Sequence, residues 1–260
     1  MSNFIKEFWN NQALKFKGNP TASWGDYFAL DLEHKNISEY IKDGDIVLDA
    51  GCANGFATIK HATEKNINIT GIDYAESMID YANENLEISN LKNINLKNIN
   101  FKVNDITKLE FPDNYFDVVY TTRVLINLPT WEEQKKGIFE CLRVVKKGGT
   151  VVFSEGFFEP FMKLNVIRNN FNLSPLEEHD FNRYIKKYKI EKLFNDNNLE
   201  HKNVDFSSMY YIGSRVLRDI FTTPSDYEGY SNPINEDFYN LELKYSGSDV
   251  GIQQLYVVKK

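Results

Sequence analysis

The stretch from Val47 to Gly55 constrains the fold more than any other part of the sequence. It begins as a short apolar run, ends in a turn that contains two glycines, and leads into a helical pattern from Phe56. This order predicts a buried strand, a tight loop and a helix. A strand that is apolar throughout is typical of a parallel sheet covered by helices on both faces. The sequence therefore predicts an α/β fold with this loop at the carboxyl edge of the sheet.

Two acidic residues stand at the ends of neighbouring predicted strands. Asp49 closes the first strand, and Asp73 ends the next strand-like run, which starts at Ile67. A ligand that carries a nucleoside needs a loop without side chains and a carboxylate one βα unit later for its ribose hydroxyls. Asp73 could instead cap a helix. Its place about 20 residues beyond the loop favours the ribose contact.

The glycine spacing limits which nucleotide can bind. A dinucleotide fingerprint needs three glycines, G-x-G-x-x-G, and a phosphate-binding P-loop ends in Gly-Lys-Ser/Thr. Here Gly51 and Gly55 have three residues between them, and Asp49 precedes both. An acidic residue would repel a pyrophosphate but suits a ligand with a cationic amino-acid portion. The missing third glycine counts against a nicotinamide-dependent reductase.

Composition excludes several classes of function. The 260 residues carry a net charge of −7, which argues against a nucleic-acid partner and is compatible with a small-molecule partner. The two cysteines, Cys52 and Cys141, lie in the glycine loop and in a helical run, so we expect no disulfide and a reducing compartment. No C-x-x-C or H-x-x-x-H spacing occurs, and we therefore expect no metal. Without a signal peptide or a long apolar run, the expected location is the cytoplasm, away from membranes. The oligomeric state stays open.

The chain from about Tyr40 to Ser154 resembles the class I S-adenosylmethionine (SAM)-dependent methyltransferases. The resemblance rests on the D-x-G-x-x-x-G loop from Asp49, on the turn and strand from Phe111 to Tyr120, and on the segment Arg-Val-x-Lys-x-Gly-Gly. It implies a Rossmann-like sheet of seven strands, mostly parallel with the last strand antiparallel, helices on both faces and a C-terminal cap insertion. It also implies SAM as cofactor and S-adenosylhomocysteine (SAH) as product.

The resemblance further implies which residues touch the cofactor. Asp73 would bind the ribose diol, Tyr74 would flank the adenine, and Asp105 would accept a hydrogen bond from the adenine amino group. Taken alone, Asp105 reads as a turn residue. The complete expected set is Asp49, Gly51, Cys52, Gly55, Asp73, Tyr74, Met78, Asp105, Ile106 and Thr122.

The remaining pattern predicts how the chain is organised. Residues 1–42 are expected to hold helices that form either a flap over the cofactor or a layer on the sheet edge. Residues 43–260 are expected to form the methyltransferase domain, in which segments 156–182 and 208–248 cap the carboxyl edge. We also expect helices at Phe181–Phe194 and Gly213–Phe221, loops at Leu91–Asn100 and Thr223–Gly247, and a closing strand at Gln253–Val258 antiparallel to the one before it.

Methyl transfer from SAM is a displacement at a carbon bound to a sulfonium, and its leaving group is neutral. The protein must align the acceptor and exclude water, and it needs a base only for a weakly acidic hydroxyl. His179, in a turn after two acids, can take a proton near neutral pH, or it is a solvated turn residue. Glu155, which closes a strand, is a second candidate base, or it caps a turn. Arg123, at the rim of the sheet, is the third catalytic candidate.

Arginine and aromatic residues provide the candidates for substrate binding. The chain has six arginines, and Arg123 and Arg215 fall at the rim and in the expected cap. The guanidinium of arginine can donate two parallel hydrogen bonds to a phosphate or carboxylate. These two residues therefore predict an anionic acceptor, unless they are surface residues. Trp24 is expected near the acceptor, as is one of the neighbouring Tyr210 and Tyr211.

The segments Thr121–Leu128 and Tyr210–Arg215 narrow the resemblance to a bacterial subgroup linked to surface-polysaccharide biosynthesis. That subgroup includes enzymes that modify capsule sugars or their phosphoramidate substituents. The implied function is methyl transfer to an oxygen of a small, anionic capsule precursor. The alternatives are an N-methyltransferase of an amino sugar and a non-catalytic SAM-binding partner of another protein.

Overall fold

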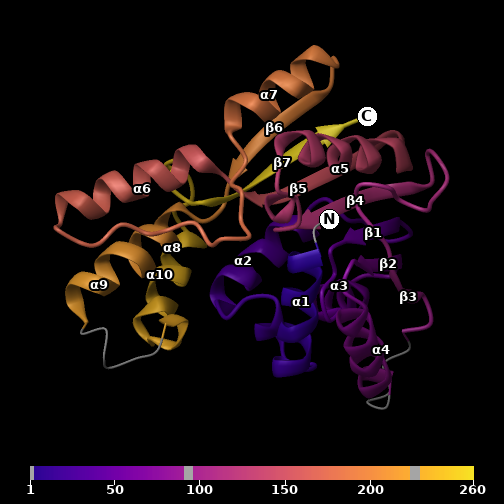
Figure 1. Ribbon diagram of the computed structural model, residues 1–260, viewed down its shortest axis with the longest axis horizontal. Coiled ribbons are helices and arrows are strands. Elements are labelled where there is room, and N and C mark those ends of the chain that lie inside the picture. Colours follow the sequence, from indigo (N-terminus) through magenta and orange to yellow (C-terminus); the bar gives the residue numbers. More distant parts are fainter. Residues whose placement is uncertain (1–2, 91–95, 223–228) are drawn as a thin grey trace.

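A computed structural model describes residues 3–90, 96–222 and 229–260, in which a seven-stranded sheet lies between layers of helices (Figure 1). The strand order is β3-β2-β1-β4-β5-β7-β6. β7 runs antiparallel to both β5 and β6, and the other pairs are parallel, which confirms the predicted fold class. The strands are β1 (Ile46–Ala50), β2 (Asn68–Asp73), β3 (Ile99–Val103), β4 (Phe116–Thr122), β5 (Val145–Gly156), β6 (Glu200–Asp205) and β7 (Gln253–Lys259).

The helices cover both faces of the sheet. The α-helices are α1 (Asn3–Phe16), α2 (Tyr27–Ser38), α3 (Phe56–Glu64), α4 (Glu76–Asn90), α5 (Trp131–Val144), α6 (Phe158–Asn170), α7 (Lys187–Asp196), α8 (Ser208–Ile212), α9 (Arg218–Phe221) and α10 (Ile234–Glu242). Short 3-10 turns are η1 (Pro20–Ala22), η2 (Leu125–Asn127) and η4 (Gly229–Ser231), while η3 (Gly213–Leu217) is a π-helix that joins α8 to α9. None of the helices in the described ranges is long and apolar enough to cross a membrane.

Two hydrophobic clusters explain why the first strand is apolar throughout. Leu48 belongs to the cluster on the face that α5 and α7 cover, with Cys141 and Phe194. Val47, its neighbour in β1, belongs to the cluster on the opposite face with Leu32 of α2. Because successive side chains of a strand point to opposite faces, both must be apolar when both faces are buried.

The helix predicted at Phe181–Phe194 begins six residues later than expected, at Lys187. The preceding segment makes backbone hydrogen bonds with two other parts of the chain instead. The amide of Arg183 donates to the carbonyl of Ile126 at 2.6 Å, and that of Ile185 donates to the carbonyl of Gly156 at 3.0 Å. These long-range bonds outweigh the local helical pattern.

The prediction of a loop over Thr223–Gly247 is wrong at Ile234–Glu242, where α10 forms, while the other described residues of this range lie in no α-helix or strand. Pro233 suggested a loop, but it is the N-cap residue of α10, where its missing N–H costs no helical hydrogen bond. The side chain of Asn232 accepts a hydrogen bond from the amide of Ile234 at 3.1 Å. Residues 223–228, and residues 91–95 of the loop predicted at Leu91–Asn100, lie outside the described residues.

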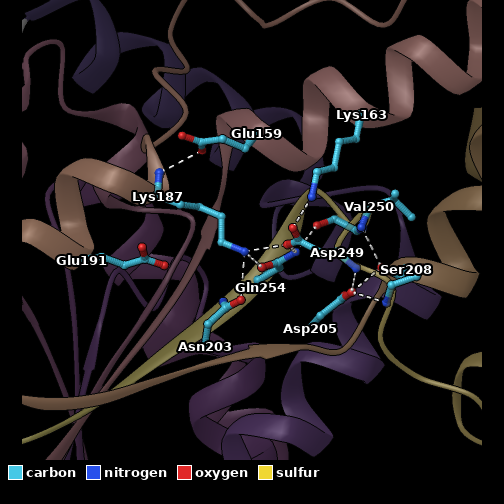
Figure 2. Close-up of polar contacts among 12 residues, drawn as sticks. Glu159, Lys163, Lys187, Glu191, Asn203, Asp205, Ser208, Asp249, Val250 and Gln254 are labelled. Carbon is cyan, nitrogen blue, oxygen red and sulfur yellow. Dashed lines mark hydrogen bonds and ion pairs between the residues drawn. The ribbon is translucent and has the colours of Figure 1, made fainter.

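A polar network fixes the connection that leads into β7 (Figure 2). Lys187 of α7 bonds to Asp249 at 2.6 Å, to Asn203 at 2.9 Å and to Gln254 at 3.0 Å. Lys163 of α6 also pairs with Asp249. Burial raises the pKa of Asp249, but the hydrogen bonds from the two lysines prevail and bring it down to about 2. The network therefore ties α6, α7 and the sheet edge together.

We expect Lys187→Met to destabilise the fold by about 1–3 kcal/mol, because the buried Gln254 and the partly exposed Asp249 lose a donor. The free energy of unfolding, from urea denaturation, measures the effect. Lys192→Met is the matched control, since Lys192 pairs with Asp196 on the exposed surface and should change stability by less than about 0.5 kcal/mol. Equal effects of the two changes would show that the network does not stabilise the connection.

Candidate functional site

A cavity of about 1390 Å³ lies at the carboxyl edge of the sheet. Its walls come from the loops after β1, β2, β3 and β4, from α1 and α2, and from segments 176–184 and 211–236 as far as they are described. Sites for one small molecule usually measure about 300–1,000 Å³, so this cavity has room for a cofactor and a second molecule. Part of each predicted cap segment and both N-terminal helices contribute to it.

The glycine loop approaches the cavity without side chains. Gly51 has a φ of 96°, and a Cβ there would lie 1.8 Å from Cγ2 of Val124. Gly55 has a φ of 76°, and a Cβ there would lie 2.6 Å from Cζ of Phe101. Gly51 lines the cavity, whereas Gly55 does not: it packs the loop against β3. The prediction that Gly55 touches the cofactor is therefore replaced by a packing role.

Two carboxylates, those of Asp49 and Asp73, line the cavity beside this loop. Asp73 accepts hydrogen bonds from the backbone amides of Ala53, at 3.0 Å, and Ala75, at 2.9 Å. Thr58 donates its hydroxyl to Asp49 at 2.6 Å. Burial raises the pKa of Asp73 to about 6 and that of Asp49 to about 7. Asp73 thus shapes the glycine loop and also faces the space where a ribose would lie.

Asn104 lines the cavity in place of the predicted Asp105. Asp105 turns back on its own chain, where one carboxylate oxygen accepts both the amide and the hydroxyl of Thr107 at 2.8 Å. Asn104 is 7% exposed, and neither atom of its side-chain amide has a hydrogen-bond partner in the described structure. An amide can donate and accept at once, which matches the edge of an adenine. Ile106 lines the same wall.

The other residues predicted to touch the cofactor also lie at the cavity. Tyr74 and Met78 follow β2, Cys52 belongs to the glycine loop, and Thr122 ends β4. Lys6 of α1 lies over the ring of Tyr74, with its ammonium 5.2 Å from the ring centroid. The N-terminal helix therefore reaches the side of the cavity formed by the residues after β2.

Arg123 lines the cavity, but its charge is already balanced. It pairs with Glu33, a buried carboxylate of α2 that also accepts the hydroxyl of Ser154 at 2.5 Å. The guanidinium of Arg123 lies 4.7 Å from the ring centroid of Trp24. Sequence reasoning missed Glu33, because nothing in the local pattern of α2 distinguishes it from a surface residue.

The positive charge of Arg215 is also balanced by a buried carboxylate. It pairs with the fully buried Asp26 at 2.5 Å, and its guanidinium lies 4.6 Å from the ring centroid of Tyr230. Tyr211 lines the cavity, whereas Tyr210 lies outside it and donates its hydroxyl to Asp26 at 2.5 Å. Tyr210 is therefore part of the support of Arg215 and is not placed for substrate contact.

Glu155 is not placed to act as a base. It is fully buried, lies outside the cavity, and accepts hydrogen bonds from the hydroxyl of Thr121 and the amides of Val124, Leu125 and Ile126. Burial raises its pKa to about 7. Its carboxylate holds the turn after β4 in place. His179, by contrast, lines the cavity and stacks on Phe181, with ring centroids 5.5 Å apart.

Comparison with known proteins agrees with this geometry. The profile of the methyltransferase domain family matches residues 41–198. An uncharacterised methyltransferase of Schizosaccharomyces pombe is 35% identical over 121 residues, which cover 45% of this chain and 42% of that protein. The 27-O-demethylrifamycin SV methyltransferase of Amycolatopsis mediterranei is 28% identical over 120 residues, 46% of this chain and 42% of that protein. The chain thus spans less than half the length of these curated relatives.

A solved structure shares the fold over nearly the whole chain. It is the geranyl diphosphate C-methyltransferase from Streptomyces coelicolor in complex with Mg²⁺, geranyl diphosphate and SAH. The TM-score is 0.59 at 13% identity, and the match covers 98% of this chain and 95% of that one.

The sheet order, the bare loop and the carboxylates beside it are those expected of the class I SAM-dependent methyltransferase fold. Since the family profile covers more than half of the sequence, the chain belongs to the methyltransferase domain family, and SAM is its cofactor. The side chains present fit this cofactor, because the unpaired amide of Asn104 and the cradle at Gly51 lie in one cavity. The comparisons support the family, and not the narrower surface-polysaccharide subgroup.

Proposed function

We propose that the chain transfers a methyl group from SAM to an oxygen of a small molecule with an apolar or aromatic body. The observation that carries this proposal is the aromatic lining of the cavity beyond the glycine loop. This wall includes Trp9, Trp24, Phe28, Phe181, Tyr211 and Tyr230. Such rings bind flat or apolar acceptors and exclude water from the reacting centre.

This acceptor class replaces the anionic capsule precursor that the arginines suggested. Arg123 is paired with Glu33, and Arg215 with Asp26. An anionic acceptor would have to share each guanidinium with a buried carboxylate that already offsets its charge, which weakens the attraction. A sugar phosphate therefore loses the support that sequence reasoning gave it.

The chain's own residues would divide the work between holding the cofactor and placing the acceptor. Asp49 and Asp73 would hold the cationic amino acid and the ribose of SAM, whose bound sulfonium supplies the methyl group. The aromatic wall would align the acceptor, with α1 and α2 as the flap that excludes water. His179 would take the proton of a hydroxyl acceptor.

The choice of oxygen as the acceptor atom rests on His179. Similarity does not decide it, because relatives named for O-, N- and C-methylation match this chain, among them 27-O-demethylrifamycin SV, phosphoethanolamine N- and sterol 24-C-methyltransferases. An amine that is already neutral needs no base. Removal of His179 should therefore impair methylation of a hydroxyl and leave methylation of a neutral amine unchanged.

We expect His179→Ala to lower kcat by about 10²–10⁴ with a hydroxyl acceptor and to leave SAM affinity unchanged, because only proton removal is lost. The test first measures SAH release with a panel of phenols, hydroxylated aromatics, amines and phosphorylated sugars. Turnover of sugar phosphates alone would overturn the acceptor class. Full activity of the variant on a hydroxyl acceptor would remove His179 as the base.

SAM affinity should fall as the pH is lowered from about 7.5 to 5.5. Burial raises the pKa of Asp49 to about 7 and of Asp73 to about 6 in the unliganded chain, so both are ionised at the upper pH and protonated at the lower one. A protonated Asp49 no longer attracts the cationic portion of SAM. For each proton that SAM must displace, the affinity for SAM falls by up to about tenfold per pH unit.

The stability of the unliganded chain should change with pH in the opposite direction. Carboxyls with raised pKa values stabilise the fold fully below their ordinary pKa, and this contribution is lost as the pH rises through 6 to 7. The increase in melting temperature on adding SAM should therefore be larger at pH 7.5 than at pH 5.5. Equal increases at both values would contradict the assignment of these carboxylates to the cofactor.

A further inference from the structure

Two histidines and a glutamate lie together where α2 meets α3, and none of the three is among the residues assigned to the cofactor. His34 belongs to α2, while His61 and Glu64 stand three residues apart on one side of α3. Nε2 of His34 lies 2.8 Å from Oε2 of Glu64, and the two imidazole rings stack with their centroids 4.0 Å apart. One ligand atom from each of the three residues lies within 4.8 Å of the others.

Three imidazole nitrogens of this cluster have no hydrogen-bond partner in the described structure. They are Nδ1 of His34 and both ring nitrogens of His61. His61 is fully buried and His34 is 4% exposed. A neutral imidazole offers one N–H donor and one acceptor, and folded proteins pair nearly all such buried groups with protein, water or an ion. The three nitrogens without a partner therefore indicate that a molecule or an ion binds here.

Two lysines, Lys60 and Lys65, lie near this cluster. Lys60 and Lys65 are close enough to repel a cation, but each is directed to other oxygens. Lys60 pairs with Asp31 at 2.7 Å, and Lys65 donates to the carbonyl of Ile41 at 2.5 Å. Glu64 adds the negative charge that a cation needs.

We propose that His34, His61 and Glu64 bind a divalent transition-metal ion, with Zn²⁺ as the occupant. Imidazole nitrogen and carboxylate oxygen are zinc ligands, and three protein ligands leave the fourth position to water. The ion would replace the direct contact between His34 and Glu64. The two stacked rings would rotate so that one nitrogen of each faces the ion.

Such an ion would join α2 to α3 and fix one wall of the cavity. His34 and His61 both line the cavity, and Glu33, the neighbour of His34, holds Arg123. The search for C-x-x-C and H-x-x-x-H spacing missed this site because its ligands come from two helices. Its role is to stabilise the N-terminal wall, so it is separate from methyl transfer itself.

The test measures metal content and Zn²⁺-dependent stability of the full chain. After dialysis against ZnCl₂ and removal of excess, we expect one zinc per chain, a higher melting temperature than the chelator-treated protein, and a Co²⁺ absorption spectrum typical of four-coordinate geometry. Glu64→Gln, whose amide can still bond to His34, should fold and bind Zn²⁺ at least about tenfold more weakly. His61→Asn should lose the ion.

His201→Asn is the matched control, because it removes a histidine from β6, outside the cluster. It should bind Zn²⁺ as the wild type does. The proposal is overturned if the wild type takes up no zinc, or if Glu64→Gln and His201→Asn retain the same affinity. SAM binding, measured in parallel on chelator-treated protein, distinguishes failure of the metal site from failure of the methyltransferase assignment.

Discussion

Asp73→Ala is expected to weaken SAM binding by about 10²–10⁴. In the proposed complex the carboxylate accepts both ribose hydroxyls, and each hydrogen bond to a charged group contributes about 1.5–3 kcal/mol. The variant also removes the acceptor that the amides of Ala53 and Ala75 use, so the glycine loop loses its anchor as well. Isothermal titration of both proteins with SAM measures the two dissociation constants.

Asp80→Ala is the matched control for this change. Asp80 is an exposed residue of α4, the helix that follows Asp73, and its removal subtracts the same charge. It should leave SAM affinity within about twofold, because an exposed charge contributes little. If Asp73→Ala binds SAM as tightly as Asp80→Ala does, the ribose contact is wrong.

Gly51→Ala is expected to abolish measurable SAM binding and to destabilise the fold by about 2–4 kcal/mol. A side chain at a φ of 96° is strained, and its Cβ would lie 1.8 Å from Cγ2 of Val124. The loop must therefore move, and it carries the backbone that approaches the cofactor. Titration with SAM and urea denaturation measure the two effects.

Gly44→Ala is the control that separates the effect of backbone strain from that of steric overlap between side chains. Gly44 has a φ of 90°, but a Cβ there would meet nothing within 4 Å. The free energy of unfolding of this variant should fall by only about 1–2 kcal/mol, the cost of backbone strain, and its affinity for SAM should stay unchanged. The double change Gly51→Ala with Val124→Ala should recover part of the stability. Tight binding of SAM by Gly51→Ala alone would show that the loop does not cradle the cofactor.

The sequence predicted the elements that are defined locally. The continuous apolar strand from Ile46, the two glycines and Asp73 one βα unit later specify a parallel sheet with a nucleoside site at its edge. The structure has this strand at the predicted residues and places Gly51 and Asp73 at one cavity. Hydrophobic periodicity and turn residues are short-range signals, and a single sequence contains them completely.

Side-chain direction at strand ends was the first thing the sequence could not decide. Neighbouring residues of an extended chain point to opposite sides, so an error of one position exchanges a residue that faces the cavity for one that does not. Asn104 and Asp105 were exchanged in this way. Ser154 and Glu155 also point to opposite sides, because Ser154 contacts Glu33 while Glu155 points to the turn after β4, and neither lines the cavity.

Charge pairing between residues far apart in the sequence was the second feature that the sequence could not decide. Arg123 and Glu33 are far apart in the sequence, as are Arg215 and Asp26, and nothing local indicates that each arginine has a buried partner. An arginine that appears free in the sequence suggests an anionic ligand, whereas a paired one suggests support of a wall. The pairing of both arginines is the reason why we propose an apolar or aromatic acceptor.

The most direct test of the central claim is a crystal structure of the chain with SAH. The account predicts ribose hydroxyls on the carboxylate of Asp73, adenine between Ile106 and the amide of Asn104, and the sulfur facing the aromatic wall at Trp24. SAH bound elsewhere, or with its ribose away from Asp73, would contradict the account.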